Sequence, residues 1–445
     1  MSGRRSAAAD TVPLGPEEFA GLMARFSPFE PRPRLAVALS GGADSMALLA
    51  LARDWLRERE GDLLALIVDH GLRPGSDREA TRVAAWARAL GARAEILRWE
   101  GPKPVSRIQE RAREARYRLL RDACRRAGVL HLATAHHRDD LAETVALRRM
   151  RGSGARGLAG MFAERFFEEL RLLRPLLAIP RARLEATLRA RGLPWLEDPS
   201  NLDPRFARGR LRHGPPLPVA ALFDEAVAAA RRRAGLEAAL ASFCARHLRP
   251  HPTGLLEVSA TAWRALSPEP AELFLERAAM VAAGSPYPPR RRKLAALAAT
   301  LRHLGEGRRT LAGCIFEIVP GGRRLRIGRE PGRIAPPLAS GGEGTVLWDR
   351  RWRLETGLGC PPVTIGALAA IEDAALRRRL FARARACGLP RWFAAGLPVV
   401  VRDGRPVLWP LAAGPRRGPA LRLVYAPRRR MTEPPVEGIL VSTFC

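Results

Sequence analysis

Lysine is almost absent from the sequence: of its 75 lysine and arginine residues, only Lys103 and Lys293 are lysines. The chain also has 45 aspartate and glutamate residues, so its formal net charge at pH 7 is +30. Biased codon usage exchanges lysine for arginine without changing the net charge, so it explains the scarcity of lysine but not the positive excess. A charge of this size predicts a polyanionic partner, and nucleic acid is the first candidate.

Paired cysteines and long apolar runs are absent as well. The six cysteines show no Cys-x-x-Cys spacing, which argues against a disulfide framework or a zinc knuckle. No segment approaches the roughly 20 apolar residues of a membrane-spanning helix, and Met1–Leu14 lacks the long apolar core of a signal peptide. We therefore expect a soluble cytoplasmic protein without a membrane partner.

The length of 445 residues exceeds that of one compact domain, and a hydrophobic content of 47% is enough to build a real core. A proline-dense stretch at residues 213–218 indicates a linker. We expect an N-terminal extension at 1–30, an α/β domain at 31–215, a mainly helical domain at 216–330 that ends in a hairpin, and a C-terminal α+β domain at 331–445.

Between residues 34 and 177, short β-rich runs alternate with longer amphipathic segments, which is typical of a doubly wound parallel sheet. The expected strands are Leu35–Leu39, Leu63–Val68, Ala94–Leu97, Leu130–Ala135 and Leu172–Leu176. The expected helices are Ser45–Arg59, Arg78–Leu90, Ile108–Arg126 and Asp139–Met150, followed by Val219–Leu248, Ala271–Ala283 and Arg290–Leu304. Two hairpins are expected, one from Thr310–Val319 to Arg323–Gly328 and one from Val399–Arg402 to Val407–Trp409.

The strongest local signal is the string Ser40-Gly41-Gly42-Ala43-Asp44-Ser45, which follows an expected strand and opens an expected helix. This arrangement directs backbone N–H groups and the positive end of a helix dipole toward one point, where an anion such as a phosphate binds. The glycines let a phosphate approach the backbone, the serine hydroxyls can donate hydrogen bonds, and Asp44 can help to hold Mg²⁺. An ordinary βα turn with a serine cap is the alternative.

A Walker loop is ruled out, because the pattern GxxxxGK[ST] needs a Gly-Lys pair and the chain has none. The string at residues 40–45 instead resembles the pyrophosphate-binding loop of the N-type ATP pyrophosphatases, which transfer AMP to a substrate oxygen and release pyrophosphate. The resemblance implies an adenine nucleotide alpha hydrolase-like fold, with this loop binding ATP.

Polar residues also follow two other expected strands. Asp69 and His70 follow the second strand, and His137, Asp140 and Glu143 follow the fourth. Since the carboxyl ends of parallel strands line the ligand crevice, Asp69 and His70 are expected near the nucleotide. Asp140 and Glu143 share one helical face and can bind a cation, either Mg²⁺ or an ammonium group. The alternatives are solvated strand ends and acidic residues favoured by a helix dipole.

Arginine recurs in three segments that are suited to phosphate or RNA contact. Arg113 and Arg116 lie one turn apart on an expected helix, and Arg151 opens a glycine-rich loop at residues 151–161. The third segment contains Arg205, Arg208 and Arg210 around a single aromatic residue, which suits a surface that follows a nucleic-acid strand. For each segment alone, a solvated face is the alternative.

These motifs occur in an order that is similar to that of the tRNA(Ile)-lysidine synthase family. The matching strings are Val68–Ser76, Arg113–Tyr117, Thr134–Thr144, Arg151–Met161, Arg174–Leu177 and Leu193–Asn201. One departure is Gly209, which stands between Arg208 and Arg210 where the family usually has asparagine. Beyond residue 212 the match is in outline only, and it is best at Arg309–Cys314.

The resemblance implies a ligase that uses ATP to join free L-lysine to carbon 2 of the wobble cytidine in the CAU anticodon of isoleucine tRNA. An adenylated cytidine is the implied intermediate, and AMP and pyrophosphate are released. The implied catalytic residues are Asp44, His137, Asp140 and Glu143, with Asp44 and Asp140 as Mg²⁺ ligands. The implied contacts to tRNA or lysine are Arg113, Arg116, Arg151, Arg205, Arg208 and Arg210.

Three other functions stay open on the sequence alone. A tRNA thiolase shares the superfamily, but its relatives that act on cytidine use paired cysteines, which this chain lacks. An amidotransferase-type synthesis of a small metabolite gives no reason for the charge of +30. The third is a tRNA-binding module that keeps ATP only as a structural ligand. The sequence also leaves open whether the chain forms a homodimer.

Overall fold

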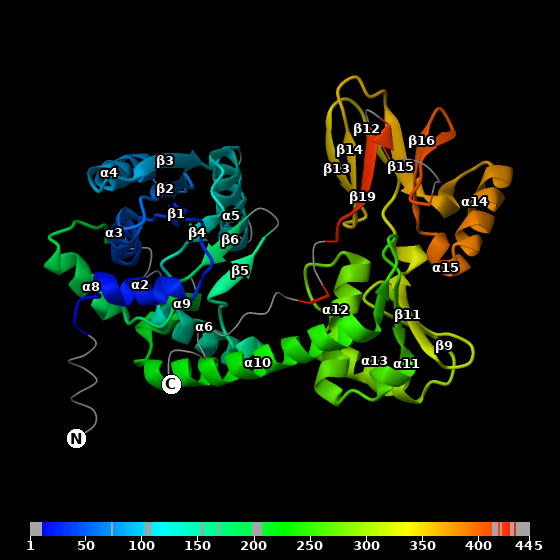
Figure 1. Cartoon of the computed structure of the whole chain (residues 1–445), viewed down its shortest axis with the longest axis horizontal. Coiled ribbons are helices and arrows are strands. Elements are labelled where there is room, and N and C mark those ends of the chain that lie inside the picture. Colours follow the sequence, from blue (N-terminus) through cyan, green and yellow to red (C-terminus); the bar gives the residue numbers. More distant parts are fainter. Residues whose placement is uncertain are drawn as a thin grey trace. The chain divides into compact units, whose positions relative to one another are not determined.

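The computed structural model describes residues 11–72, 74–101, 103, 108–152, 155–167, 170–197, 207–411, 417–418, 421–427 and 431–432. The chain divides into two compact units, and the division falls between Ala234 and Gly235, inside helix α10 (Val219–His247). The predicted domain boundary between residues 215 and 216 lies just before α10 and stays a prediction. Figure 1 shows the elements of both units.

A six-stranded sheet forms the centre of unit 1, with the strand order β3-β2-β1-β4-β6-β5 (Figure 1). All neighbouring strands are parallel except the edge strand β5, which pairs with β6 in the antiparallel sense. The strands are β1 (Arg34–Ala38), β2 (Asp62–Asp69), β3 (Arg93–Arg98), β4 (His131–Ala133), β5 (Glu164–Phe166) and β6 (Arg171–Leu173). The predicted doubly wound parallel sheet is confirmed, and β5 is an addition to it.

Helices cover both faces of this sheet. On β1, Leu35 and Val37 pack in one core cluster with residues of α3, while Ala36 and Ala38 pack in a second cluster with residues of α5. This alternation follows from the period of two in a strand. The helices before α10 are α2 (Pro16–Ala24), α3 (Ala43–Arg57), α4 (Ser76–Ala89), α5 (Ile108–Ala127), α6 (Arg138–Met150), α7 (Ala155–Leu158), α8 (Arg181–Ala190) and α9 (Ala207–His213).

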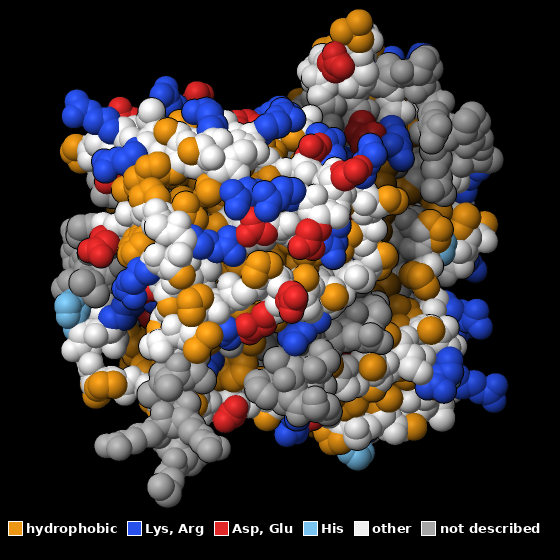
Figure 2. All heavy atoms as spheres, turned by 60° about the vertical axis from the view of Figure 1, so that its left-hand side comes forward, with side chains coloured by type: hydrophobic (Ala, Val, Ile, Leu, Met, Phe, Trp, Pro, Cys, Tyr) orange, Lys and Arg blue, Asp and Glu red, His pale blue; other side chains and the backbone are white. Residues whose placement is uncertain are grey.

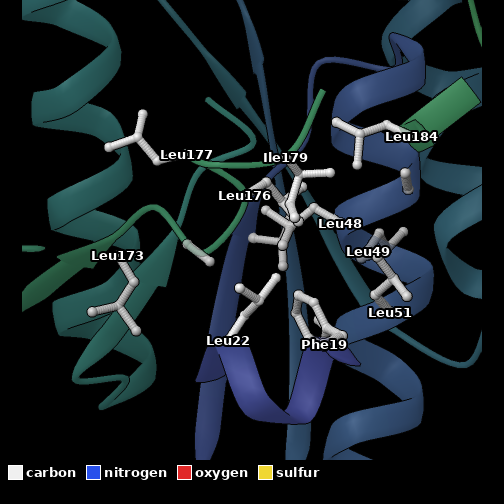
Figure 3. Close-up of a cluster of buried hydrophobic side chains, with 14 of the residues drawn as sticks. Phe19, Leu22, Leu48, Leu49, Leu51, Leu173, Leu176, Leu177, Ile179 and Leu184 are labelled. Carbon is white, nitrogen blue, oxygen red and sulfur yellow. The ribbon is translucent and has the colours of Figure 1, made fainter. Parts of the chain in front are cut away.

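The predicted N-terminal extension contains helix α2, which belongs to the core of unit 1. The helix starts with Pro16, and acidic residues occupy its first turn, both of which are typical of a helix start. Figure 3 shows Phe19 and Leu22 in one apolar cluster with Leu48 of α3 and with Ile179, which precedes α8. Burial of a side chain of this kind contributes about 1.5–3 kcal/mol.

Polar contacts also join the α2 segment to α8. The backbone N–H of Leu14 donates a hydrogen bond to Thr187 Oγ1 at 2.8 Å. Arg183 forms an ion pair with Glu18 of α2 at 2.7 Å. Because these contacts come from residues more than 160 positions apart in the chain, local sequence patterns do not reveal them.

Unit 2 combines helices with antiparallel sheets. Its first sheet has the order β7-β8-β11-β10-β9 and shares one core cluster with α12 and α13. The elements are β7 (Leu248–Pro250), β8 (Leu256–Ser259), α11 (Ala260–Arg264), α12 (Pro268–Ala283), α13 (Arg291–His303), β9 (Gly307–Leu311), β10 (Cys314–Ile318) and β11 (Arg324–Arg329). The expected hairpin between β10 and β11 is confirmed. The run Thr310–Val319 is not one strand, however, because the chain reverses at Ala312 and Gly313, whose φ angles are +53° and +75°.

Two four-stranded sheets complete unit 2, with the orders β12-β15-β16-β17 and β13-β14-β19-β18. They share an apolar cluster that includes Trp348, Trp352 and Val400. The elements are η2 (Pro331–Arg333), β12 (Leu338–Ser340), β13 (Gly344–Trp348), β14 (Trp352–Thr356), β15 (Val363–Ala367), η3 (Leu368–Ala370), α14 (Ala374–Ala386), α15 (Arg391–Ala394), β16 (Pro398–Arg402), β17 (Arg405–Leu408), β18 (Arg417–Gly418) and β19 (Leu421–Tyr425). The expected α+β character and the β16–β17 hairpin are confirmed. Within the described ranges, no helix is both long enough and apolar enough to cross a membrane.

Candidate active site

The loop at residues 40–45 joins β1 to α3 and packs tightly around Gly41. This residue has a φ of +88°, and an added Cβ would lie 2.4 Å from Val83 Cγ2 and 2.9 Å from Leu196 Cδ1. The carbonyl oxygen of Gly41 also accepts a hydrogen bond from the Leu196 N–H at 2.8 Å. The backbone conformation and the packing of the protein itself therefore both require glycine at this position.

The hydroxyl of Ser45 is turned into the loop. Its Oγ accepts hydrogen bonds from the backbone N–H groups of Ser40 and Gly41, each at 3.1 Å, and donates to the Gly42 carbonyl oxygen at 3.0 Å. Ser45 is buried, and the Ser40 hydroxyl lies 3.1 Å from its Oγ. Ser45 thus shapes the loop in this structure, and its predicted hydrogen bond to a phosphate stays a prediction.

His137 brings the loop and helix α6 together. It is the buried N-cap residue of α6, and its Nε2 lies 3.5 Å from Asp44 Oδ2 and 3.4 Å from Asp140 Oδ2. Asp140 Oδ2 accepts a hydrogen bond from the backbone N–H of His137 at 3.3 Å, and the backbone nitrogen of Asp140 lies 3.4 Å from His137 Nδ1. Three of the predicted catalytic residues, Asp44, His137 and Asp140, therefore meet at one point.

The surrounding carboxylates favour the protonated form of His137. Burial lowers the pKa of His137, but hydrogen bonds to Asp139 and Asp44 and the charges of Asp140 and Asp44 outweigh this effect and raise the pKa to about 10. Asp139 Oδ2 lies 3.5 Å from His137 Nδ1. Burial raises the pKa of Asp139, yet His137 and the backbone N–H of Arg181 bring it down to about 2. At neutral pH His137 is therefore an imidazolium in this structure, which can donate a proton.

Glu143 lies on α6 near this group and is held by an arginine. Arg212 of α9 donates from Nε to Glu143 Oε1 at 2.6 Å and from Nη2 to Oε2 at 3.3 Å. Burial lowers the pKa of Arg212, but the hydrogen bond to Glu143 and the charges of Glu143, Asp140 and Asp44 raise it overall. At the predicted cation site on α6, Glu143 is thus paired with the guanidinium of Arg212 in this structure.

Asp69 lies at the end of β2, the strand next to β1. Its Oδ1 accepts hydrogen bonds from the Gly71 N–H at 2.9 Å and from the Ser76 hydroxyl at 2.7 Å. Burial raises the pKa of Asp69, but these hydrogen bonds lower it overall. The carboxylate therefore orders the turn that follows β2, and its predicted contact with a nucleotide stays a prediction.

His70 packs edge-to-face against Trp99, with the ring centroids 6.0 Å apart. Burial and the charge of Arg116 lower the pKa of His70, so its ring is neutral at pH 7. Its Nδ1 is buried and has no hydrogen-bond partner among the described residues. Arg116 of α5 is therefore close enough to His70 for its charge to act on the ring, and the predicted roles of His70 at ATP and of Arg116 at tRNA or lysine stay predictions.

The other predicted arginine contacts lie on α5, on α9 and in the loop after α6. Arg113 is exposed, with its guanidinium 5.1 Å from the centroid of the Tyr117 ring. Arg151 and Arg210 are also exposed. Gly209 is buried in α9. Arg205 and the side chain of Arg208 lie outside the described residues.

Asp44 and Asp140 suit a Mg²⁺ ion in the type and number of their donors. Asp44 Oδ1 is buried and accepts no hydrogen bond from the described residues, although a buried carboxylate oxygen normally accepts one. Protein sites commonly hold Mg²⁺ through one or two carboxylates together with substrate phosphates, without a complete cage of side chains. The described residues contain no group of three or more His, Cys, Asp and Glu side chains that could hold a metal by themselves.

Sequence reasoning missed three residues that adjoin this group: Asp139, Arg181 and Arg212. Asp139 and Arg212 stand within strings that the sequence singles out, but nothing in those strings identifies their partners. Arg181 carries no sequence signal at all, and its Nε lies 3.9 Å from Asp44 Oδ1.

Comparisons with known proteins show the family of this chain. A family model described as the PP-loop domain matches residues 17–214. The tRNA(Ile)-lysidine synthase of Ruegeria pomeroyi is 37% identical over 406 residues, which cover 89% of this chain and 91% of the relative. The chain belongs to the tRNA(Ile)-lysidine synthase family. A second tRNA(Ile)-lysidine synthase, from Bradyrhizobium sp. strain BTAi1, is 51% identical over 205 residues, which cover 46% of this chain and 56% of the relative.

A solved structure with partial similarity is the U34-tRNA thiolase NcsA from Methanococcus maripaludis with its [4Fe-4S] cluster. It is 15% identical with a TM-score of 0.39, and the alignment covers 48% of this chain and 77% of that chain. This likeness is too low to bear on function. Membership of the tRNA(Ile)-lysidine synthase family rests on the sequence matches, and the PP-loop match contains Asp44, His137, Asp140 and Glu143.

Proposed function

We propose that this protein is a tRNA(Ile)-lysidine synthase that ligates free L-lysine to carbon 2 of the wobble cytidine in isoleucine tRNA, using ATP. The observation that carries the proposal is the meeting of Asp44, from the loop after β1, with His137 and Asp140 at the start of α6. A phosphate-binding turn and a group of carboxylates at the carboxyl ends of neighbouring strands are what an adenylating enzyme needs.

In the first step, O2 of the cytidine attacks the α-phosphorus of ATP, and the bond from this phosphorus to the bridging oxygen breaks. Pyrophosphate leaves with the electron pair. The N–H groups at the start of α3 are proposed to stabilise the negative charge of the phosphates. Asp44 and Asp140 would hold Mg²⁺, which supplies further positive charge to the phosphates when it is bound.

In the second step, the ε-nitrogen of lysine attacks carbon 2 and the bond from carbon 2 to the AMP oxygen breaks. Free lysine is protonated at neutral pH, with a pKa near 10.4, so a base must take a proton before attack. The carboxylates of Asp140 and Glu143 are proposed to grip the ammonium group, and these two residues and His137 are the candidates to accept its proton. Arg212 must give up Glu143 before this carboxylate can do so.

The tRNA contacts are proposed on the basic segments of α5 and α9. On the face of the molecule in Figure 2, arginine side chains are interspersed with aspartate and glutamate, and no large area of a single charge stands out. The net charge of +30 therefore does not by itself locate the RNA surface. Arg113, Arg116, Arg151 and Arg210 belong to the same unit as the active-site residues, which supports them as the contacts.

Thiolation is the weaker alternative, because it needs reactive thiolates. Burial raises the pKa of Cys124 and of Cys314 to about 12 and that of Cys244 to about 11. These thiols are protonated and shielded at neutral pH. The state of these three buried cysteines therefore argues against their use as sulfur carriers.

The deciding experiment incubates the full chain with isoleucine tRNA carrying the CAU anticodon, ATP and isotope-labelled lysine. We expect AMP to form only when both tRNA and lysine are present, and mass analysis to find a nucleoside that equals cytidine plus lysine minus water. A labelled sulfur nucleoside, or AMP formed without RNA, would point to another member of the superfamily. A tRNA that binds but stays unmodified would support the non-catalytic alternative.

A further inference from the structure

The phosphate loop contains no cation of its own, since residues 40–45 include neither lysine nor arginine. In the folded chain, a cation from helix α8 lies beside this loop. Arg181, the first residue of α8, has its Nε 3.9 Å from Asp44 Oδ1. We propose that Arg181 binds the pyrophosphate that leaves during adenylation and is thus a catalytic residue. This inference rests on the proposed function for the origin of the pyrophosphate.

The backbone of Arg181 is fixed at the site by helix α6. Its N–H donates a hydrogen bond to Asp139 Oδ2 at 3.0 Å, and the same oxygen lies 3.5 Å from His137 Nδ1. Asp139 thereby ties the start of α8 to the start of α6. The amino ends of α3, α6 and α8 all adjoin Asp44 in this way, so three helix dipoles add positive potential at one place.

The side chain of Arg181 remains adjustable. It is 46% exposed, and besides its contact with Asp44 it forms an ion pair with Glu185, one turn further along α8, at 3.2 Å. An exposed ion pair of this kind contributes little to stability, so a phosphate group can compete for the guanidinium. A guanidinium offers paired N–H donors that match two oxygens of one phosphate.

The chemistry of the step gives this cation a task. When the bond between the α-phosphorus and the bridging oxygen breaks, negative charge grows on the departing pyrophosphate. A cation beside Asp44 stabilises that charge more in the transition state than in bound ATP. In Walker loops the lysine of the loop meets the phosphates. Here an arginine from another helix takes that place.

The chain offers a matched control for the test. Arg189 pairs with the other carboxylate oxygen of the same Glu185, also at 3.2 Å, but it stands two turns further along α8. Arg181→Met and Arg189→Met therefore remove equivalent ion pairs, and only the first removes a cation from the phosphate loop. Arg181→Lys keeps the charge and loses the paired donors.

Two measurements test the proposal on the full chain. The first is the inhibition constant of inorganic pyrophosphate in the tRNA- and lysine-dependent formation of AMP. The second is pyrophosphate binding by calorimetry, which needs no turnover. We expect Arg181→Met to weaken both by about ten-fold or more and to slow AMP formation by about 100-fold, Arg181→Lys to recover part of each loss, and Arg189→Met to match the wild type.

The outcomes separate the inference from the proposed function. Wild-type pyrophosphate binding and inhibition in Arg181→Met overturn the role of Arg181, whatever the enzyme makes. A second outcome is that the wild-type protein binds pyrophosphate but forms no lysine adduct, and that Arg181→Met loses the binding. This outcome supports the pyrophosphate site and overturns the proposed reaction. Equal losses in Arg181→Met and Arg189→Met would assign Arg181 a merely structural role and also overturn the inference.

Discussion

Arg212 of α9 holds Glu143 of α6 through both carboxylate oxygens, at 2.6 Å and 3.3 Å. The Glu143 side chain is 8% exposed, so its charge is nearly removed from water, and the guanidinium of Arg212 pairs with it there. A lysine ammonium that is to reach Glu143 must replace the guanidinium. In the proposed reaction, entry of lysine is therefore linked to the release of Glu143 by Arg212, a residue of the helix that also carries Arg210.

Substitution of Arg212 should destabilise unit 1. We expect Arg212→Met to lower the free energy of unfolding by about 1–4 kcal/mol, because it leaves a buried carboxylate without its cation. Urea denaturation measures the change. The double variant Arg212→Met with Glu143→Gln should recover part of the loss, since no buried charge then remains. A single variant as stable as the wild type would mean that the pair contributes nothing to folding.

Substitution of Glu143 should affect lysine use and spare the first step. For Glu143→Gln we expect the KM for lysine to rise about ten-fold or more while ATP- and tRNA-dependent adenylation continues, because a neutral amide cannot pair with an ammonium ion. Steady-state kinetics with varied lysine and a separate assay of pyrophosphate release measure the two effects. Asp54→Asn is the control: it breaks an ion pair with Arg191, also 2.6 Å long, and Asp54 is not one of the proposed site residues. A lysine KM that stays unchanged in Glu143→Gln would move the amine site elsewhere.

Substitution of Asp44 should stop the chemistry without releasing the RNA. Asp44→Ala removes the carboxylate that meets His137 and Arg181, and we expect AMP formation to fall by about 100-fold or more. The affinity for isoleucine tRNA, measured by filter binding at fixed salt, should stay within about two-fold because Asp44 carries no RNA contact in the proposal. Near-normal turnover in this variant would refute the assignment of the phosphate loop.

The charge on His137 predicts how stability depends on pH. Its pKa rises from 6.5 in the unfolded chain to about 10 in the folded one, so its stabilisation is complete below pH about 6.5 and is lost as the pH rises toward 10. Urea denaturation of the ligand-free protein at pH 6.5 and pH 9.5 measures this loss. In His137→Gln the decrease over the same range should be smaller. Equal decreases in the two proteins would show that His137 does not titrate in this window.

Much of unit 1 follows from its sequence periods. The alternation of Leu35 and Val37 with Ala36 and Ala38 predicts a strand buried on both faces, and the glycine string after it predicts the turn into α3. The short edge strand β5 and helix α2 escape prediction because brief segments take their structure from the partners they pack against. The reversal at Ala312 and Gly313 escapes it because alanine seldom adopts a positive φ.

The candidate site is predicted in its residues and less well in its contacts. Position alone places Asp44, His137 and Asp140 at the crevice, since they end or follow neighbouring parallel strands. Which cation faces which carboxylate depends on where α8 and α9 return to the sheet. No local pattern encodes that return, so the partners of Glu143 and Asp44 become visible only in the folded chain.

The contacts of α2 with α8 have a practical side for anyone who expresses this protein. Leu14 and Glu18 hold Thr187 and Arg183, two residues of the helix whose first member reaches the phosphate loop. A shortened clone that started at the first strand would lose these contacts and would expose the leucines of α3 that pack against α2. Weak activity in such a clone would then report a loosened α8 and say nothing about the reaction itself.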